Sequence, residues 1–418
     1  MEDKRELAND TYVPEIRFKG FTAPWEQRKF GELGSVAMCK RIFKEQTTTE
    51  GDVPFFKIGT FGGNPDAYIS RELFEEYKSK FQYPEVGDML ISASGTIGRT
   101  VEYTGKDEYF QDSNIVWFKH DNRIENSFLR YIYQIVKWDG IEGSTIKRLY
   151  NDNFLKTKFT MPSVAEQKKL GEFFKQLDHL IILYQRKCDM LKNLKASMLT
   201  KMFPKEGESV PEIRFKGFTE PWKQRKLSEI ATMHARIGWQ NLRTSEFLDN
   251  GDYMLITGTD FEDGRINFST CHYVEKERYD QDRNIQIGDG SILITKDGTL
   301  GKVAYVQGLK KPATLNAGVF NVEIRNENEV DRKYLFQYLK APFLMDYVGR
   351  KATGGTIKHL NQNILVDFPI VMPQKAEQEK IGQYFEGIDN LITLHQRKYE
   401  KLLDVKKAFL EKMIGGDN

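Results

Sequence analysis

A ten-residue segment occurs twice in this 418-residue chain, and the repeat constrains the fold more than any other feature. Residues 13–22, VPEIRFKGFT, return letter for letter as residues 210–219. A second matched pair follows: AEQ at 165 and 376, then QRK at 185 and 396. The offset grows from 197 (13 to 210) to 211 (165 to 376), so the second half holds 14 more residues between its matched blocks. Identical frames around divergent interiors indicate a duplicated unit whose interior is free to change.

Long helices are predicted at 165–203 and 376–414, because both blocks lack Pro and repeat apolar residues every seven positions. Further apolar residues lie four positions after most of these. A sustained heptad is typical of a coiled coil. We expect the helices, each on the order of 50 Å long at about 1.5 Å per residue, to pair antiparallel as a rigid spacer. The alternative, each helix packing only on its own domain, stays open. The predicted coiled-coil core comprises Leu170, Phe174, Leu177, Ile181, Tyr184, Leu191, Met198, Ile381, Phe385, Ile388, Ile392, Leu402 and Phe409.

The repeat also defines the domain organisation. We predict an α+β fold with a pseudo-two-fold internal repeat, in which two mixed α/β domains are joined by the two long helices. The predicted segments are a charged N-terminal tail (1–12), a first domain (13–160), a first helix (161–203), a linker (204–209), a second domain (210–373) and a second helix (374–414).

A glycine-containing turn is the first feature that both interiors share. Apolar runs at 88–92 and 291–295 are predicted as buried strands, and they lead into SGTIGR at 94–99 and DGTLGK at 297–302. The glycines can serve a tight hairpin that needs positive φ. They can also let the backbone approach a DNA phosphate while nearby side chains donate hydrogen bonds. These interpretations are compatible, and the candidate donors are Ser94, Thr96, Arg99, Lys296, Thr299 and Lys302.

A second shared loop precedes each long helix, with the letters GSTIKR at 143–148 and GGTIKH at 354–359. Small residues, a hydroxyl and basic groups suit contact with a DNA backbone or base edge. An ordinary surface loop with solvated charges is the alternative. The candidate DNA contacts here are Thr145, Lys147, Arg148, Thr356, Lys358 and His359, and further candidates after the first strands are Lys40, Arg41, His234 and Arg236.

Charge and composition restrict the class of protein. A formal net charge of +2 is low for a protein that binds DNA alone, so partners are expected to supply many of the phosphate contacts. The sequence contains no run of about 18 apolar residues and no apolar signal region near its N-terminus. Its three cysteines lack metal-ligand spacing. A cytoplasmic protein without a metal site is therefore expected.

Motifs for catalysis are missing from the sequence. There is no G-x-x-x-x-G-K-[ST] phosphate loop, so ATP hydrolysis by this chain is not expected. Asp66, Glu76 and Lys78 resemble a nuclease metal site, but the second half lacks this pattern and such spacing arises often by chance. We predict a binding protein with no catalytic residues and no cofactor of its own.

Taken in order, these motifs resemble those of the specificity subunit of type I restriction-modification systems. The resemblance runs from about residue 13 to residue 414 and rests on the repeated PEIRFKGF blocks, the glycine turns, the T-I-K loops and the helices that open with AEQ. Each motif alone is weakly specific, whereas their order, given twice, is distinctive.

The resemblance implies two target-recognition domains that each read one half of a bipartite DNA site, and an antiparallel coiled coil between them. It also implies two modification subunits, which hold S-adenosylmethionine and methylate adenine, and up to two restriction subunits, which use ATP and Mg²⁺. This chain would then be the non-catalytic part that chooses the sequence. A coiled-coil scaffold that binds only proteins is the alternative function.

Overall fold

The computed structural model describes residues 11–141, 147–205, 207–297, 300–351 and 360–415. The chain forms two compact units, one made of Met1–Gln185 with Gln396–Asn418 and the other of Arg186–His395. Two long helices, α4 (Val164–Met202) and α10 (Lys375–Met413), contribute one half to each unit. The helices are thus part of both compact units, whereas the sequence-based division treated them as separate segments.

Three small sheets form the strand content of the first unit, in the orders β1-β2-β10, β3-β9-β6-β7 and β5-β4-β8. The strands are β1 (Thr11–Tyr12), β2 (Trp25–Lys29), β3 (Gly34–Ala37), β4 (Val53–Phe56), β5 (Tyr68–Ile69), β6 (Met89–Ser92), β7 (Thr100–Glu102), β8 (Tyr109–Phe110), β9 (Ile115–His120) and β10 (Lys158–Met161). The short helices are α1 (Arg71–Lys80), α2 (Asn126–Ile135) and α3 (Asn151–Lys156).

The sheets of the second unit have the orders β11-β22, β12-β21-β18-β19, β16-β13-β20-β17 and β14-β15. The strands are β11 (Lys223–Lys226), β12 (Ala231–His234), β13 (Tyr253–Ile256), β14 (Phe261–Glu262), β15 (Arg265–Ile266), β16 (His272–Val274), β17 (Gln286–Ile287), β18 (Ile292–Thr295), β19 (Val303–Tyr305), β20 (Ala313–Leu315), β21 (Val319–Ile324) and β22 (Pro369–Met372). The short helices are α5 (Leu227–Ile230), α6 (Lys276–Asp280), α7 (Arg332–Lys340), α8 (Phe343–Lys351) and α9 (Gln362–Val366).

Both units share one topology. The antiparallel sheet β3-β9-β6-β7 corresponds to β12-β21-β18-β19, and the parallel pair β4/β8 corresponds to the parallel pair β13/β20. The hairpin β14–β15 and helix α8 of the second unit have no counterpart among the described residues of the first. The divergent interiors therefore fold alike, as a duplicated unit predicts.

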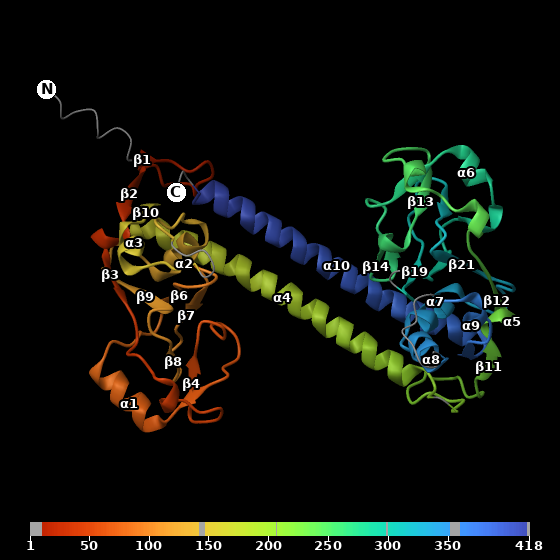
Figure 1. The fold of residues 1–418 in the computed structure, drawn as a ribbon, viewed down its shortest axis with the longest axis horizontal. Helices are drawn as coiled ribbons and strands as arrows, with labels where there is room; N and C mark the ends of the chain where they lie inside the picture. The colour runs from red at the N-terminus through yellow and green to blue at the C-terminus, as the bar shows by residue number, and fades with distance from the viewer. Residues whose placement is uncertain (1–10, 142–146, 206, 298–299, 352–359, 416–418) are drawn as a thin grey trace. The chain divides into compact units, whose positions relative to one another are not determined.

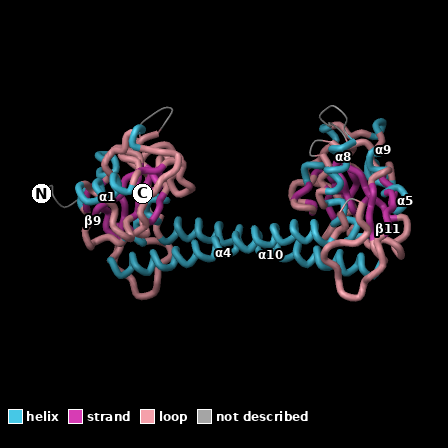
Figure 2. Tube along the Cα trace, turned by 90° about the horizontal axis from the view of Figure 1, so that it is seen from below, coloured by secondary structure: helices cyan, strands magenta, loops and turns pink. Residues whose placement is uncertain are grey.

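The long helices pair antiparallel, and the heptad residues supply the contacts. In the first unit, Leu170 and Phe174 of α4 share a core with Leu410 and Met413 of α10. In the second, the opposite ends meet, and Leu199 shares a core with residues of α10 that include Phe385. Figures 1 and 2 show the helix halves of each unit side by side.

Every predicted coiled-coil core residue is buried or half-buried, from Leu170, which is 2% exposed, to the half-buried Phe409. The expected antiparallel coiled coil is thus confirmed. Within the described residues, no helix is both long enough and apolar enough to cross a membrane.

Candidate nucleic-acid interface

The repeated ten-residue block anchors each unit to a long helix. Nε and Nη2 of Arg17 each lie 2.7 Å from a carboxylate oxygen of Glu166 on α4. Arg214 makes the same two contacts, at 2.7 Å each, with Glu377 on α10. Both carboxylates are 1% exposed, so these are buried bidentate ion pairs. The letter-for-letter repeat thus has a structural role, as the frame that holds the variable interiors.

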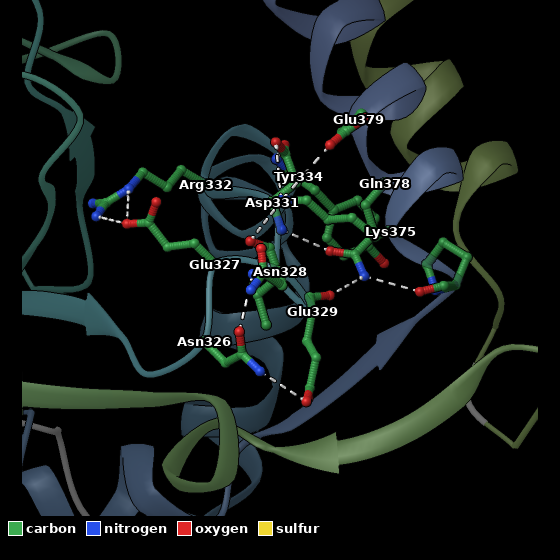
Figure 3. Close-up of polar contacts among 12 residues, drawn as sticks. Asn326, Glu327, Asn328, Glu329, Asp331, Arg332, Tyr334, Lys375, Gln378 and Glu379 are labelled. Carbon is green, nitrogen blue, oxygen red and sulfur yellow. Dashed lines mark hydrogen bonds and ion pairs between the residues drawn. The ribbon is translucent and has the colours of Figure 1, made fainter.

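The glutamines of the AEQ motifs hold the loop that starts α2 or α7. Oε1 of Gln378 accepts from the backbone N–H of Asp331 at 2.9 Å, and Nε2 donates to the carbonyls of Glu329 and Pro373 (Figure 3). Gln167 makes the equivalent contacts with Glu125 N–H and with two carbonyls. Each glutamine accepts one hydrogen bond and donates two, so the repeated motif makes the same three contacts in both halves.

In the first unit, the antiparallel sheet β3-β9-β6-β7 brings the candidate loops together. Its register pairs Ala37 with Trp117, Ser92 with Ile115 and Ile91 with Thr100. The end of β3, the start of β9 and the β6–β7 turn therefore lie together at one end of the strands, which we call one edge of the sheet. The described residues just before α3, from Lys147 on, join them, because Gly95 N–H donates to the carbonyl of Lys147 at 2.9 Å.

The first recognition edge is our name for the exposed side chains at this place: Lys40, Arg41, Thr96, Arg99, Lys147 and Arg148. Some are partly engaged, since Arg41 Nε lies 2.8 Å from Asp112 and Arg99 Nη1 donates to the carbonyl of Phe61 at 2.9 Å. The basic groups and hydroxyl of this edge suit phosphate contacts.

Apart from Arg148, sequence reasoning missed the residues that shape a hollow on this edge. An open hollow of about 380 Å³ is lined by Met38, Ser113, Arg148, Tyr150 and Asn151, among others. Tyr150 is 48% exposed and can stack on a base. Ser113 has a φ of 59°, which is unusual for a residue other than glycine. An exposed aromatic beside Lys147 and Arg148 was the signal in the sequence that could have pointed here.

The corresponding sheet of the second unit gathers His234, Lys296 and Lys302 at one edge, the second recognition edge. His234 pairs with Asn321 across the β12–β21 register, and Thr295 pairs with Val319. Lys302 is exposed, whereas Lys296 and His234 are half-buried. Leu360, two residues before α9, also lies at this edge, because its N–H donates to the carbonyl of Lys296 at 2.8 Å.

Two of the predicted contacts are corrected by the structure. Ser94 is 4% exposed, and its hydroxyl donates to Asn114 Oδ1 at 2.7 Å. Arg236 is 2% exposed, and it donates to the carbonyl of Leu315 at 3.0 Å and to Thr314 Oγ1 at 3.2 Å. Burial lowers the pKa of Arg236, and the like charge of Arg278 lowers it further. Both side chains are committed inside their units, so we withdraw them as DNA contacts.

Five candidates, Thr145, Thr299, Thr356, Lys358 and His359, lie outside the described residues.

The carboxylates of the nuclease-like pattern have separate ion-pair partners. Asp66 lies 2.8 Å from Lys57, and Glu76 lies 2.9 Å from Lys80. Among the residues that the structure describes, no group of three or more His, Cys, Asp or Glu is placed to hold a metal ion.

A family model described as the type I restriction modification DNA specificity domain matches residues 23–193 and 219–404. The two matched regions cover most of the chain, one in each half, so the chain belongs to this family and is a DNA sequence specificity subunit.

Curated relatives agree with this assignment. The chain is 54% identical over 153 residues to the candidate type I restriction enzyme specificity subunit S.HindORF215P of Haemophilus influenzae, a match that spans 36% of this chain and 40% of the relative. It is 21% identical over 339 residues to the type I restriction enzyme MjaVIII specificity subunit of Methanocaldococcus jannaschii, covering 79% of this chain and 76% of the relative.

The fold has a solved counterpart as well. The crystal structure of the type I restriction-modification system S subunit from M. genitalium matches with a TM-score of 0.63 at 16% identity, over 96% of this chain and 99% of that one. At this identity the likeness concerns the fold alone. No comparison supports the alternative of a scaffold that binds only proteins.

Proposed function

We propose that this chain reads a bipartite double-stranded DNA target, one half-site with each unit, and directs partner adenine methyltransferase and restriction subunits to it. The observation that carries the proposal is the recurrence of one recognition edge on one shared topology, with different side chains in the two units. Two different interiors on a repeated frame suit two different half-sites.

The chemistry is assigned to the partners. In this proposal the chain is a non-catalytic cytoplasmic subunit without a cofactor, S-adenosylmethionine is bound by two modification subunits, and ATP and Mg²⁺ serve up to two restriction subunits. The net charge of +2 fits this division, since partners would supply part of the phosphate contact.

Exposed leucines on the helices are candidate contacts for the modification subunits. Leu180 and Leu183 of the first unit are 39% and 37% exposed. Their repeat mates Leu391 and Leu394 of the second unit are 46% and 47% exposed. Large apolar side chains on a solvent-facing helix surface are typical of an interaction site. One such pair in each unit would accommodate two copies of the same partner.

A chimera tests the proposal. Strand pairs β2/β10 and β11/β22 frame the interiors, so residues 30–157 can be replaced by a second copy of residues 227–368 without altering the frame. The complex with modification subunits is then incubated with a random DNA pool, and the retained sequences are read. The native chain should select two different half-sites, and the chimera should select one of them twice. An unaltered target for the chimera would refute the assignment of one half-site to each unit.

A further inference from the structure

Each long helix carries one lysine at a heptad core position that is otherwise apolar. Lys195 of α4 follows Phe174, Ile181 and Cys188 at seven-residue intervals, and Lys406 of α10 follows Phe385, Ile392 and Tyr399 in the same way. The two lysines are repeat mates, since both lie 17 residues after an aspartate, Asp178 or Asp389.

Antiparallel pairing brings each lysine to the aspartate of the other helix. In the second unit, Lys195 Nζ lies 2.7 Å from Asp389 Oδ1, with the side chains 9% and 18% exposed. In the first unit, Lys406 Nζ lies 2.7 Å from Asp178 Oδ1, with the side chains 17% and 19% exposed. The two ion pairs are thus the same contact made twice.

A short helix of each unit joins the same aspartate. Tyr131 of α2 donates its hydroxyl to Asp178 at 3.0 Å. Gln337 of α7 donates Nε2 to Asp389 at 2.8 Å. Each aspartate therefore connects both long helices with a helix of its own unit, and it fixes where that unit sits along its helix pair.

A heptad of apolar residues does not by itself select a unique register, because a slip of seven residues restores apolar contacts. Such a slip would place each lysine opposite a Gly or a Gln instead of an Asp, since the positions seven residues from Asp389 are Gly382 and Gln396, and those from Asp178 are Gly171 and Gln185. Two nearly buried ammonium groups would then lack a carboxylate partner, which is costly. Parallel pairing in register would instead oppose Asp to Asp and Lys to Lys. A single polar residue at a core position is known to specify register at some cost in stability.

We propose that the pairs Lys195–Asp389 and Lys406–Asp178 form a duplicated register lock, meaning two equivalent ion pairs that allow only one axial alignment of α4 and α10. These four residues then determine the length of the gap between the two half-sites. A slip of one heptad would shift the helices by about 10 Å at about 1.5 Å per residue, which is roughly three base pairs at about 3.4 Å per pair. The consequence for the gap rests on the proposed function, whereas the lock itself does not.

Charge reversal in the complete complex with modification subunits tests the lock. The α4 reversal, Asp178→Lys with Lys195→Asp, opposes like charges at both contacts. The full reversal adds Asp389→Lys and Lys406→Asp and restores attraction at both. We expect the α4 reversal to lower the melting temperature and to reduce methylation at the native gap at least tenfold, and the full reversal to recover both. Native-level methylation by the α4 reversal, or a full reversal no better than it, would overturn the proposal.

An apolar variant distinguishes an effect on the helix register from an effect on the stability of the fold. Replacing both pairs, through Lys195→Met, Asp389→Leu, Lys406→Met and Asp178→Leu, removes the lock without leaving a buried charge. We expect a melting temperature at or above the native value and methylation of the same half-sites at more than one gap. A single native gap in this variant would overturn the proposal.

The matched control reverses the Lys333–Glu386 pair, which has the same 2.7 Å separation but joins α7 to α10 only. Its gap should stay native. If the unmodified complex gives no split motif at all, the proposed function fails, and the melting temperatures of the two reversals alone then decide on the lock.

Discussion

The guanidinium of Arg17 holds both carboxylate oxygens of Glu166 at 2.7 Å, and the carboxylate is 1% exposed. The contact joins the first repeated block to α4, and Arg214 with Glu377 repeats it on α10. A frame that keeps this pair in both halves can carry interiors of different sequence.

Removing one partner of this pair should destabilise the first unit. Glu166→Ala leaves the Arg17 guanidinium without its carboxylate partner in a nearly buried site, with only the carbonyl of Ala23 as an acceptor. We therefore expect the free energy of unfolding to fall by roughly 3 kcal/mol. Urea denaturation followed by circular dichroism measures the change. The control is Glu26→Ala, whose partner Arg28 is 41% exposed, and it should cost under about 1 kcal/mol. Equal losses for the two variants would contradict the assigned role.

The glutamine anchor shown in Figure 3 predicts a local effect. In Gln378→Ala, the N–H of Asp331 and the carbonyls of Glu329 and Pro373 lose their partner, so we expect a loss of about 2–3 kcal/mol. Hydrogen exchange at the Asp331 amide should accelerate as well. Gln185→Ala, at an exposed position of the other long helix, is the control. An unchanged exchange rate at Asp331 would show that the anchor is dispensable.

The first recognition edge predicts a salt-dependent effect on DNA binding. Lys147→Ala with Arg148→Ala removes two exposed cations, so affinity should fall about equally for all sequences and the slope of log K against log salt should decrease by about 1–2. Fluorescence anisotropy at several salt concentrations measures both. The control, Lys106→Ala with Lys119→Ala, removes the same charge at the opposite end of the same sheet, where β9 ends and the chain leaves β7. Identical slopes for both double variants would remove Lys147 and Arg148 from the interface.

The buried lysine predicts a pH dependence. Burial and, to a smaller extent, the nearby charge of Lys340 lower the pKa of Lys195 from its ordinary 10.5 to about 8, although Asp389 opposes the shift. Between about pH 8 and 10.5 the unfolded chain holds more protons on this group than the folded chain, so its contribution to stability rises with pH. The difference in unfolding free energy between the native chain and Lys195→Met should therefore shift in favour of the native chain from pH 8 to pH 10. A difference that stays constant over this range would contradict the shifted pKa.

The heptad periodicity of apolar residues predicted the helices, because a helix pair is stabilised mainly by burial of the apolar stripe that this periodicity produces. The predicted blocks, 165–203 and 376–414, match α4 and α10 to within one residue at each end. Lys195 was the informative exception, since a charged residue at an otherwise apolar heptad position marks a partner across the interface. Its partner Asp389 could not be found from one sequence, because the pairing depends on the register of two helices.

The sequence allowed the loops of the candidate site to be predicted, but not which of their side chains are buried and which are exposed. Strands β6 and β18 end where the glycine turns were predicted to begin, and the described glycines Gly95, Gly98 and Gly301 have the positive φ that such turns require. Burial of Ser94 and Arg236 depends on neighbours that are distant in the sequence, Asn114 and Leu315 among them. The hollow beside Tyr150 likewise arises from segments that only the fold brings together.

The most direct test of the account is a genome-wide map of methylated adenines in cells that carry the partner methyltransferase subunits, with and without this chain. We expect one split motif with a fixed gap that appears only when the chain is present. An unchanged methylation map, in cells where the chain and the methyltransferase subunits form a stable complex, would contradict the claim that this chain reads the DNA sequence.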